Sequence, residues 1–196
     1  MDNIVFPETV PFASDAQVLE IFKFPHAVLR KKGLAISTFD ADLKKFCSNL
    51  LYTMYMCKGI GLAAPQVGVL SRIFVIDISY KRETIADAEG KSKVRISNMN
   101  PLVFVNPELV DGNGEIIYEE GCLSLPGIYE KVTRQENINL KYYDLDGQER
   151  FITANGLLAV SIQHENDHLE GKVFLDRLSF LKRDFWTKKF LKGNKK

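Results

Sequence analysis

Two histidines four residues apart, His164 and His168, are the strongest chemical feature of the 196-residue sequence. On a helix, side chains at this spacing lie about 5 to 6 Å apart at Cβ, so both imidazoles can reach one divalent ion at about 2.0 to 2.1 Å. Glu165 projects beside them, where a carboxylate can take a proton from water that the ion activates. The pattern predicts a metal-dependent hydrolase, although two surface histidines or a purely structural metal site would satisfy the same spacing.

The third ligand of such a site should come from elsewhere in the chain, because a catalytic metal commonly has three protein ligands and one open position. His26 is the one remaining histidine, but Pro25 before it indicates a turn or a helix start, which favours a surface or capping role. Cys122 is the better candidate, since Gly121 lets the backbone approach a ligand closely and a thiolate binds zinc or ferrous iron readily. A buried, purely hydrophobic side chain is the alternative interpretation of Cys122 alone.

A glycine-rich segment at residues 59–68, GIGLAAPQVG, superficially matches a dinucleotide-binding fingerprint. We reject that function, because the segment follows a predicted helix instead of a strand and Pro65 would interrupt the helix that should receive the pyrophosphate. An irregular segment of this kind suits a wall along which a substrate backbone lies. Gln66 offers a neutral amide donor on that wall.

Hydrophobic periodicity predicts the helices that position these residues. Asp40 can cap a helix that ends near Gly59, and Cys47 lies on its apolar stripe, which predicts a core residue instead of a reactive thiol. Asn155 can cap a second helix through Leu169, with Gly171 ending it. That helix carries two adjoining stripes, one of Leu158, Ile162 and Leu169 and the other of Leu157, Ser161, His164 and His168.

Short apolar segments predict strands, and the whole pattern predicts an α+β fold. Asp146 and Gly147 supply the turn of one hairpin. We expect antiparallel β-sheets around a central metal-binding helix, with a C-terminal helix, in a single domain spanning residues 1–196 that begins with an arm at 1–17. Residues 79–100 are polar and without period, so we expect a surface loop there. The predicted strands are residues 72–78, 102–106, 115–118, 127–133, 138–143 and 149–153.

Charge is balanced overall, with 26 basic and 25 acidic residues, which predicts neither a DNA-binding protein nor one drawn to an anionic membrane. Residues 182–196 nevertheless carry seven basic residues and one acid, Asp184. They belong to a predicted basic helix and tail at 179–196, with Leu181 and Phe185 facing inward. An odd number of cysteines, no secretory signal and no apolar run long enough for a membrane span lead us to expect a cytoplasmic protein.

Three segments together, GIGLAAPQ at 59–66, EGCLS at 120–124 and QHENDH at 163–168, resemble in this order the three signature motifs of the peptide deformylases. The resemblance runs from about Val18 through the last helix, and it includes FPHAVLRKKG at 24–33 and LSLPG at 123–127. It implies a hydrolase of protein biosynthesis that removes the N-formyl group from the formylmethionine of nascent polypeptides and releases formate.

The resemblance also implies roles for individual residues. The metal ligands would be Cys122, His164 and His168, with Glu165 as the general acid and base. Gln66 and the backbone N–H of Leu123 would be the oxyanion donors. Two further groups would bind substrate: Ile60, Gly61 and Gly121 the peptide backbone, and Tyr118, Leu157, Val160 and Ser161 the methionine side chain.

The implied cofactor is one divalent metal ion. A thiolate with two imidazoles suits zinc and ferrous iron alike, and only the resemblance favours Fe2+ in the cell, with Zn2+, Ni2+ or Co2+ as substitutes. The implied partner is the nascent formylated polypeptide. The basic C-terminal helix is a candidate for docking on ribosomal RNA, as the similar helix does in bacterial members of the family.

Two other functions share part of this pattern. A metalloprotease of the H-E-x-x-H type would have the same histidines and glutamate, but its third ligand would usually be Glu or His. A non-catalytic metal-binding or ribosome-docking protein would explain the basic helix. Glu165 and Gln66 argue against that second alternative, because a purely structural ion needs neither.

Overall fold

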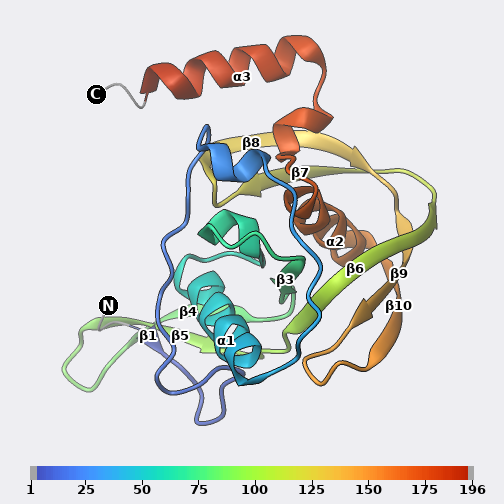
Figure 1. Ribbon diagram of the computed structural model, residues 1–196. Helices are drawn as coiled ribbons and strands as arrows, with labels where there is room; N and C mark the ends of the chain where they lie inside the picture. Colours follow the sequence, from blue (N-terminus) through green and yellow to red (C-terminus); the bar gives the residue numbers. More distant parts are fainter. Residues whose placement is uncertain (1–3, 194–196) are drawn as a thin grey trace.

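The computed structural model describes residues 4–193, in which a five-stranded antiparallel sheet has a helix on each face (Figure 1). Alternate residues of β3 (Ile73–Ile76) point to opposite sides, Val75 into a hydrophobic cluster with α1 (Ala41–Met56) and Phe74 into one with α2 (Gly156–Leu169). The strand order is β10 (Glu149–Asn155), β9 (Asn137–Tyr143), β6 (Leu102–Asn113), β3 and β2 (Gly61–Ala63). The predicted α+β fold with antiparallel sheets around the motif helix is confirmed.

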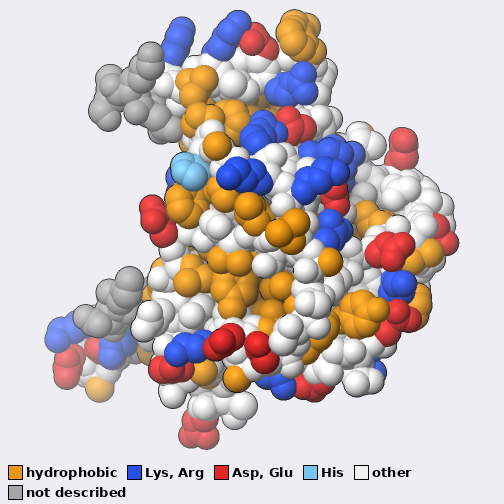
Figure 2. Space-filling view, viewed as in Figure 1, with side chains coloured by type: hydrophobic (Ala, Val, Ile, Leu, Met, Phe, Trp, Pro, Cys, Tyr) orange, Lys and Arg blue, Asp and Glu red, His pale blue; other side chains and the backbone are white. Residues whose placement is uncertain are grey.

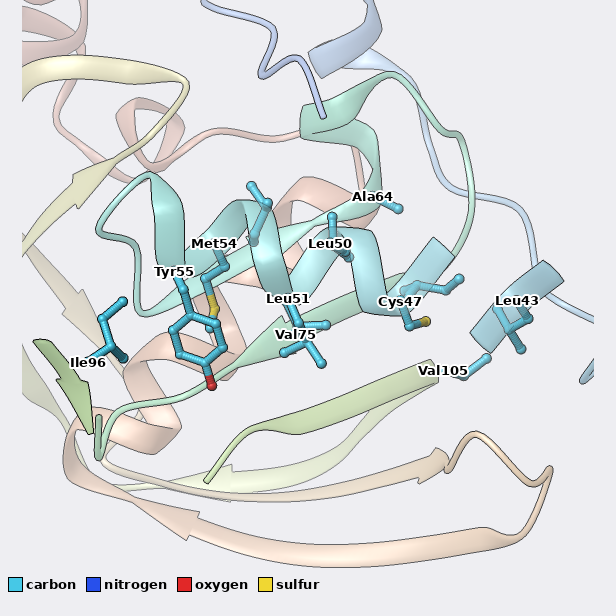
Figure 3. Close-up of a cluster of buried hydrophobic side chains, with 12 residues drawn as sticks. Leu43, Cys47, Leu50, Leu51, Met54, Tyr55, Ala64, Val75, Ile96 and Val105 are labelled. Atoms are coloured by element: carbon cyan, nitrogen blue, oxygen red, sulfur yellow. The ribbon is translucent and has the colours of Figure 1, made fainter. Parts of the chain in front are cut away.

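Helix α1 forms as predicted. The Asp40 side chain caps it by accepting a hydrogen bond from the backbone N–H of Leu43 at 2.9 Å. Cys47 is fully buried, so it is a core residue. Figure 3 shows the side chains of this cluster, with Leu51 of α1 beside Val75 of β3 and Leu50 nearer Ala64.

Helix α2 also has the predicted bounds, but not the predicted capping contact. Asn155 occupies the N-cap position without a side-chain hydrogen bond to the helix. Gly171 follows the helix with a φ of 70°, a region that glycine enters without steric cost. Ile162 and Leu169 pack against the five-stranded sheet, so the adjoining stripe with the two histidines faces away from that sheet.

Strand β6 is longer than its predicted range of 102–106. Pro107 follows that range and indicates a strand end. The chain instead passes through an irregularity between Val105 and Glu108, where Asn106 takes a φ of 49°, and it then pairs with β9 again. Such a bulge lets a proline remain within a continuous strand.

A separate two-stranded sheet covers the histidine face of α2. It consists of β7 (Ile116–Cys122) and β8 (Leu125–Arg134). Behind β8 lies a third hydrophobic cluster, to which η1 (Ala27–Arg30) and η3 (Phe174–Arg177) contribute. His26 caps η1, since its Nδ1 accepts from the backbone N–H of Val28 at 3.3 Å, and this agrees with the predicted capping role.

The expected loop at residues 79–100 is instead a hairpin. Strands β4 (Lys81–Ala86) and β5 (Ser92–Ser97) pair along their whole length, and β1 (Ile4–Val5) of the N-terminal arm adds beside β5 in parallel. The prediction was wrong because only Ile96 of the hairpin is fully buried. These strands are therefore held by backbone pairing, and they lack the alternating apolar residues from which strands are predicted.

The C-terminal helix α3 (Phe180–Gly193) forms as predicted but presents a different face to the body. Leu181 and Phe185, expected inward, are 78% and 56% exposed. Trp186 and Phe190, one turn apart, instead pack on the third cluster. In Figure 1, α3 lies along the outside of the molecule, so one narrow stripe is enough to hold it. The last part of the predicted basic tail, 194–196, lies outside the described residues.

Among residues 4–193, no helix is long and apolar enough to cross a membrane.

Candidate metal centre

The three predicted ligands meet at one point. Cys122 stands at the end of β7, whereas His164 and His168 lie on successive turns of α2 beneath it. Their ligand atoms all lie within 4.8 Å of one another, and Cys122 Sγ is 3.4 Å from His168 Nε2. This distance is too long for bonded atoms and suits two ligands that share an ion between them.

His164 is oriented by a carboxylate that the sequence analysis missed. Glu120 Oε2 lies 2.7 Å from His164 Nδ1, which leaves Nε2 of the same ring free to face the ligand cluster. Arg134 in turn holds both Glu120 oxygens, at 2.7 and 2.9 Å. Metal-binding histidines usually donate their second N–H to such a carboxylate, so the acid directly before Gly121 and Cys122 was the available signal.

The buried charges extend one step further. Arg134 Nη1 donates to Asp167 Oδ2 at 2.6 Å, and Arg177 of η3 donates to the same carboxylate. Burial raises the pKa of Glu120, but hydrogen bonds from Arg134 and His164 outweigh it and lower the pKa to about 2. Glu120 and Asp167 therefore stay ionised at neutral pH, each paired with a guanidinium. No local sequence pattern indicated Arg134 or Arg177. Arg134 reaches Glu120 through the pairing of β7 with β8, and Arg177 reaches Asp167 because the chain after α2 folds back into η3.

Titration of the central groups is strongly perturbed. Burial alone would raise the pKa of the Cys122 thiol, but the adjacent His168 and His164 lower it to about 5, which favours the thiolate that a metal requires. Burial raises the pKa of Glu165 to about 7, opposed by His164 and His168. The cluster thus combines a stabilised thiolate with a carboxyl group poised near neutrality.

The donor set fits a divalent metal ion. One thiolate and two imidazoles would supply three protein ligands, the number that a catalytic zinc or iron site commonly has. Two buried polar atoms at the site, Glu165 Oε2 and His168 Nδ1, have no hydrogen-bond partner within residues 4–193. A buried carboxylate oxygen beside the ligands is expected where a water molecule completes the site.

Gln66 lies beside the same cluster. It belongs to η2 (Ala64–Val67), directly after β2, so the expected irregular segment is regular from Gly61 to Val67. Its Oε1 accepts from the backbone N–H of Ala63 at 2.8 Å, which fixes the amide with its NH2 group outward. Nε2 is 3.2 Å from Ser124 Oγ and 3.5 Å from Cys122 Sγ. A positioned amide donor therefore faces the ligand cluster.

A cavity of about 560 Å3 opens above these groups. Glycine is needed on its wall at Gly61, where a Cβ atom would overlap the Glu165 carboxylate. Gly121 is similarly covered by the Tyr129 ring, 2.6 Å from where its Cβ would stand. Every predicted site residue except the deeper His168 lines this cavity: Ile60, Gly61, Gln66, Tyr118, Gly121, Cys122, Leu123, Leu157, Val160, Ser161, His164 and Glu165.

Comparison with known proteins decides which hydrolase has this arrangement. The family model described as polypeptide deformylase matches residues 18–184. The chain is 46% identical over 173 residues to a peptide deformylase of Thermodesulfovibrio yellowstonii, covering 88% of this chain and 96% of the relative. The chain belongs to the peptide deformylase family. It is a metal-dependent hydrolase that removes the N-formyl group from nascent peptides.

Other relatives agree with this assignment. Peptide deformylase 2 of Xanthomonas axonopodis pv. citri is 44% identical to this deformylase, covering 91% of this chain and 97% of the relative. The crystal structure of a peptide deformylase from Legionella pneumophila superposes with a TM-score of 0.77 at 40% identity, covering 91% of this chain and 96% of that one. Fold and family therefore rest on sequence and on structure alike.

Proposed function

We propose that one divalent ion held by Cys122, His164 and His168 serves deformylation, with Glu165 as the general acid and base. The observation that carries this proposal is the buried carboxylate of Glu165, which lies beside the ligand cluster and has one oxygen without a partner in residues 4–193. A carboxylate so placed can reach a water molecule in the open ligand position.

Catalysis divides between the ion and the side chains around it. The ion supplies Lewis acidity, which makes water a nucleophile near neutral pH. Glu165 accepts the proton of the attacking water and later gives it to the departing amine. The amide of Gln66 and the backbone N–H of Leu123 donate to the oxyanion that develops on the formyl oxygen. The amide of Gln66, held by the backbone N–H of Ala63 and 3.5 Å from Cys122 Sγ, supports this assignment.

Substrate binding uses the cavity wall. We propose that the backbones of Ile60, Gly61 and Gly121 pair with the peptide. The methionine side chain then lies against Tyr118, Leu157, Val160 and Ser161, of which Val160 and Ser161 are almost fully buried. Apolar and small side chains suit an unbranched thioether, which adapts to an irregular pocket.

The test is the release of formate from formyl-Met-Ala-Ser under anaerobic conditions. The intact enzyme should release formate, and Glu165→Ala should lose nearly all of this activity while keeping its metal content. Equal rates for both proteins would refute the role of Glu165. Cleavage of internal peptide bonds by a Cys122→Asp variant would instead favour a metalloprotease.

We also propose Fe2+ as the ion bound in the cell, supported by the mixed thiolate and imidazole ligands and by family membership. Protein purified without oxygen should contain about one iron per chain, and its activity should decay in air. Refilling the protein with Ni2+, Co2+ or Zn2+ tests which ions substitute. Zinc as the main metal of anaerobically purified protein would contradict the proposal.

Helix α3 is the proposed docking element for ribosomal RNA. Figure 2 shows Lys and Arg side chains gathered at the α3 end of the molecule, with hydrophobic side chains among them. Phosphate contacts by basic residues should make ribosome binding weaken as salt rises. Deleting residues 182–196 should abolish binding in a sedimentation assay. Unchanged binding, or binding insensitive to salt, would contradict a role for α3.

A further inference from the structure

Two lysines on the cavity wall have no part in the reaction described above. Lys58 directly follows Cys57, the residue that caps the end of α1, and Lys23 lies beside the Leu123 loop, where its Nζ donates to Leu123 O at 2.7 Å. Both lysines are exposed at the rim of the same cavity. Lys23 is also near Cys57, the residue before Lys58, because its charge lowers the pKa of the Cys57 thiol against the effect of burial. Neither lysine forms an ion pair with a carboxylate of residues 4–193.

The distance of Lys58 from the reacting centre follows from the chain itself. Gly61 contacts the Glu165 carboxylate closely enough that a Cβ atom there would overlap it. Lys58 precedes Gly61 by three residues, which can span at most about 10 Å. The chain turns at Lys58, which has a φ of 63°, so the actual span is shorter than this limit. An extended peptide that runs along Ile60 and Gly61 with its formyl group at the metal rises about 10 Å over three residues, which brings its third residue to the cavity rim where Lys58 lies.

The acidic residues that line the cavity do not neutralise the two lysines. Glu119 of β7 also lines the cavity, but it stands opposite Lys131 of β8 in the antiparallel register, so a cation already faces it. Glu120 is buried and held by Arg134 and His164. The cavity rim, with two lysines against the one carboxylate of Glu119, therefore has a net positive charge.

We infer that Lys58, with Lys23, makes this deformylase prefer substrates with an acidic side chain at the third residue, counting formylmethionine as the first. This inference rests on the proposed course of the peptide along Ile60 and Gly61. An exposed pair of opposite charges changes an equilibrium or a barrier by about two- to fivefold, and salt screens it. The preference concerns kcat/KM and leaves the chemistry at the metal untouched.

The experiment measures kcat/KM for three amidated peptides, formyl-Met-Ala-Glu, formyl-Met-Ala-Gln and formyl-Met-Ala-Lys. The expected order is Glu, then Gln, then Lys, in steps of about two- to fivefold at low ionic strength, with the differences shrinking in about 0.5 M salt. Lys58→Gln should reduce the steps, and Lys58→Glu, which places a carboxylate beside the remaining Lys23, should nearly abolish them. Lys58 has a φ of 63°, and since both variants keep a Cβ atom there, they carry the same backbone strain.

Lys91→Glu is the matched control, because Lys91 pairs with Glu89 on the β4–β5 hairpin and the variant changes net charge equally. This variant should keep the order of the intact enzyme. Equal rates for the Glu and Lys peptides, or rate differences that Lys58→Glu leaves unchanged, would overturn the inference alone. Failure of the neutral Gln peptide to react would instead overturn the proposed function on which the inference depends.

Discussion

Glu120 Oε2 lies 2.7 Å from Nδ1 of His164, and this contact fixes which nitrogen of the imidazole faces the metal site. The carboxylate is itself held at both oxygens by Arg134. A ligand ring restrained in this way loses little freedom when it binds an ion. The contact therefore affects metal affinity although Glu120 is not a ligand.

Replacing Glu120 by glutamine should weaken metal binding by about 10- to 100-fold, because the amide keeps the shape but loses the charge that orients His164 and pairs with Arg134. Competition with a chromogenic chelator measures the affinity. Glu130→Gln, which changes the carboxylate opposite Glu120 in the β7–β8 register, one that bonds Lys182 and Trp186 of α3 instead of a histidine, should leave metal affinity unchanged. Equal affinities for the Glu120→Gln variant and the intact enzyme would show that the contact has no such role.

Gln66→Ala should raise the barrier to deformylation by about 2.7 to 4 kcal/mol, the usual effect of removing one oxyanion donor. The loss should appear in kcat, measured by formate release. The variant also leaves the buried N–H of Ala63 without its acceptor, which should cost about 1 to 3 kcal/mol of unfolding free energy. A variant that folds and binds metal but keeps its full kcat would exclude Gln66 from catalysis.

Gly61→Ala should reduce kcat while metal content stays the same. The new methyl group would occupy the space of the Glu165 carboxylate and displace it from the open ligand position. A shift of about 1 Å in a catalytic group can cost 100-fold in rate. Metal analysis beside the kinetic assay separates this effect from loss of the ion, and an unchanged kcat would show that Glu165 tolerates the displacement.

Acid should loosen α3 from the body. Hydrogen bonds from Lys182 and Trp186 lower the pKa of Glu130, so these contacts stabilise the docked helix above the ordinary glutamate pKa of about 4.3. This stabilisation is lost as the pH falls through the lower pKa of the folded state. Emission of Trp186, the only tryptophan, should shift to the red on acidification, before the far-ultraviolet dichroism of the body changes.

Glu130→Gln tests the cause of this shift. Its emission at pH 7 should already resemble that of the acidified enzyme, and it should change little as the pH falls. A variant that keeps the same pH profile as the intact enzyme would show that another group controls the docking of α3.

The sequence determined the two imidazole ligands and the carboxylate beside them because these residues are close together along the chain. His164, Glu165 and His168 occupy little more than one helical turn, so local helix geometry alone places them side by side. The Asp40 cap and the buried Cys47 were equally predictable, since capping and apolar periodicity depend on nearby residues.

Only the tertiary structure decided what depends on distant segments. Arg134 meets Glu120 through the pairing of β7 and β8, and it meets Asp167 because that hairpin covers α2. The inward stripe of α3 is Trp186 and Phe190, because the surface available behind β8 selects among several apolar side chains of the helix. Local sequence patterns show which side chains can be buried or can bind a ligand. Which residue each side chain contacts depends on segments that meet only after folding.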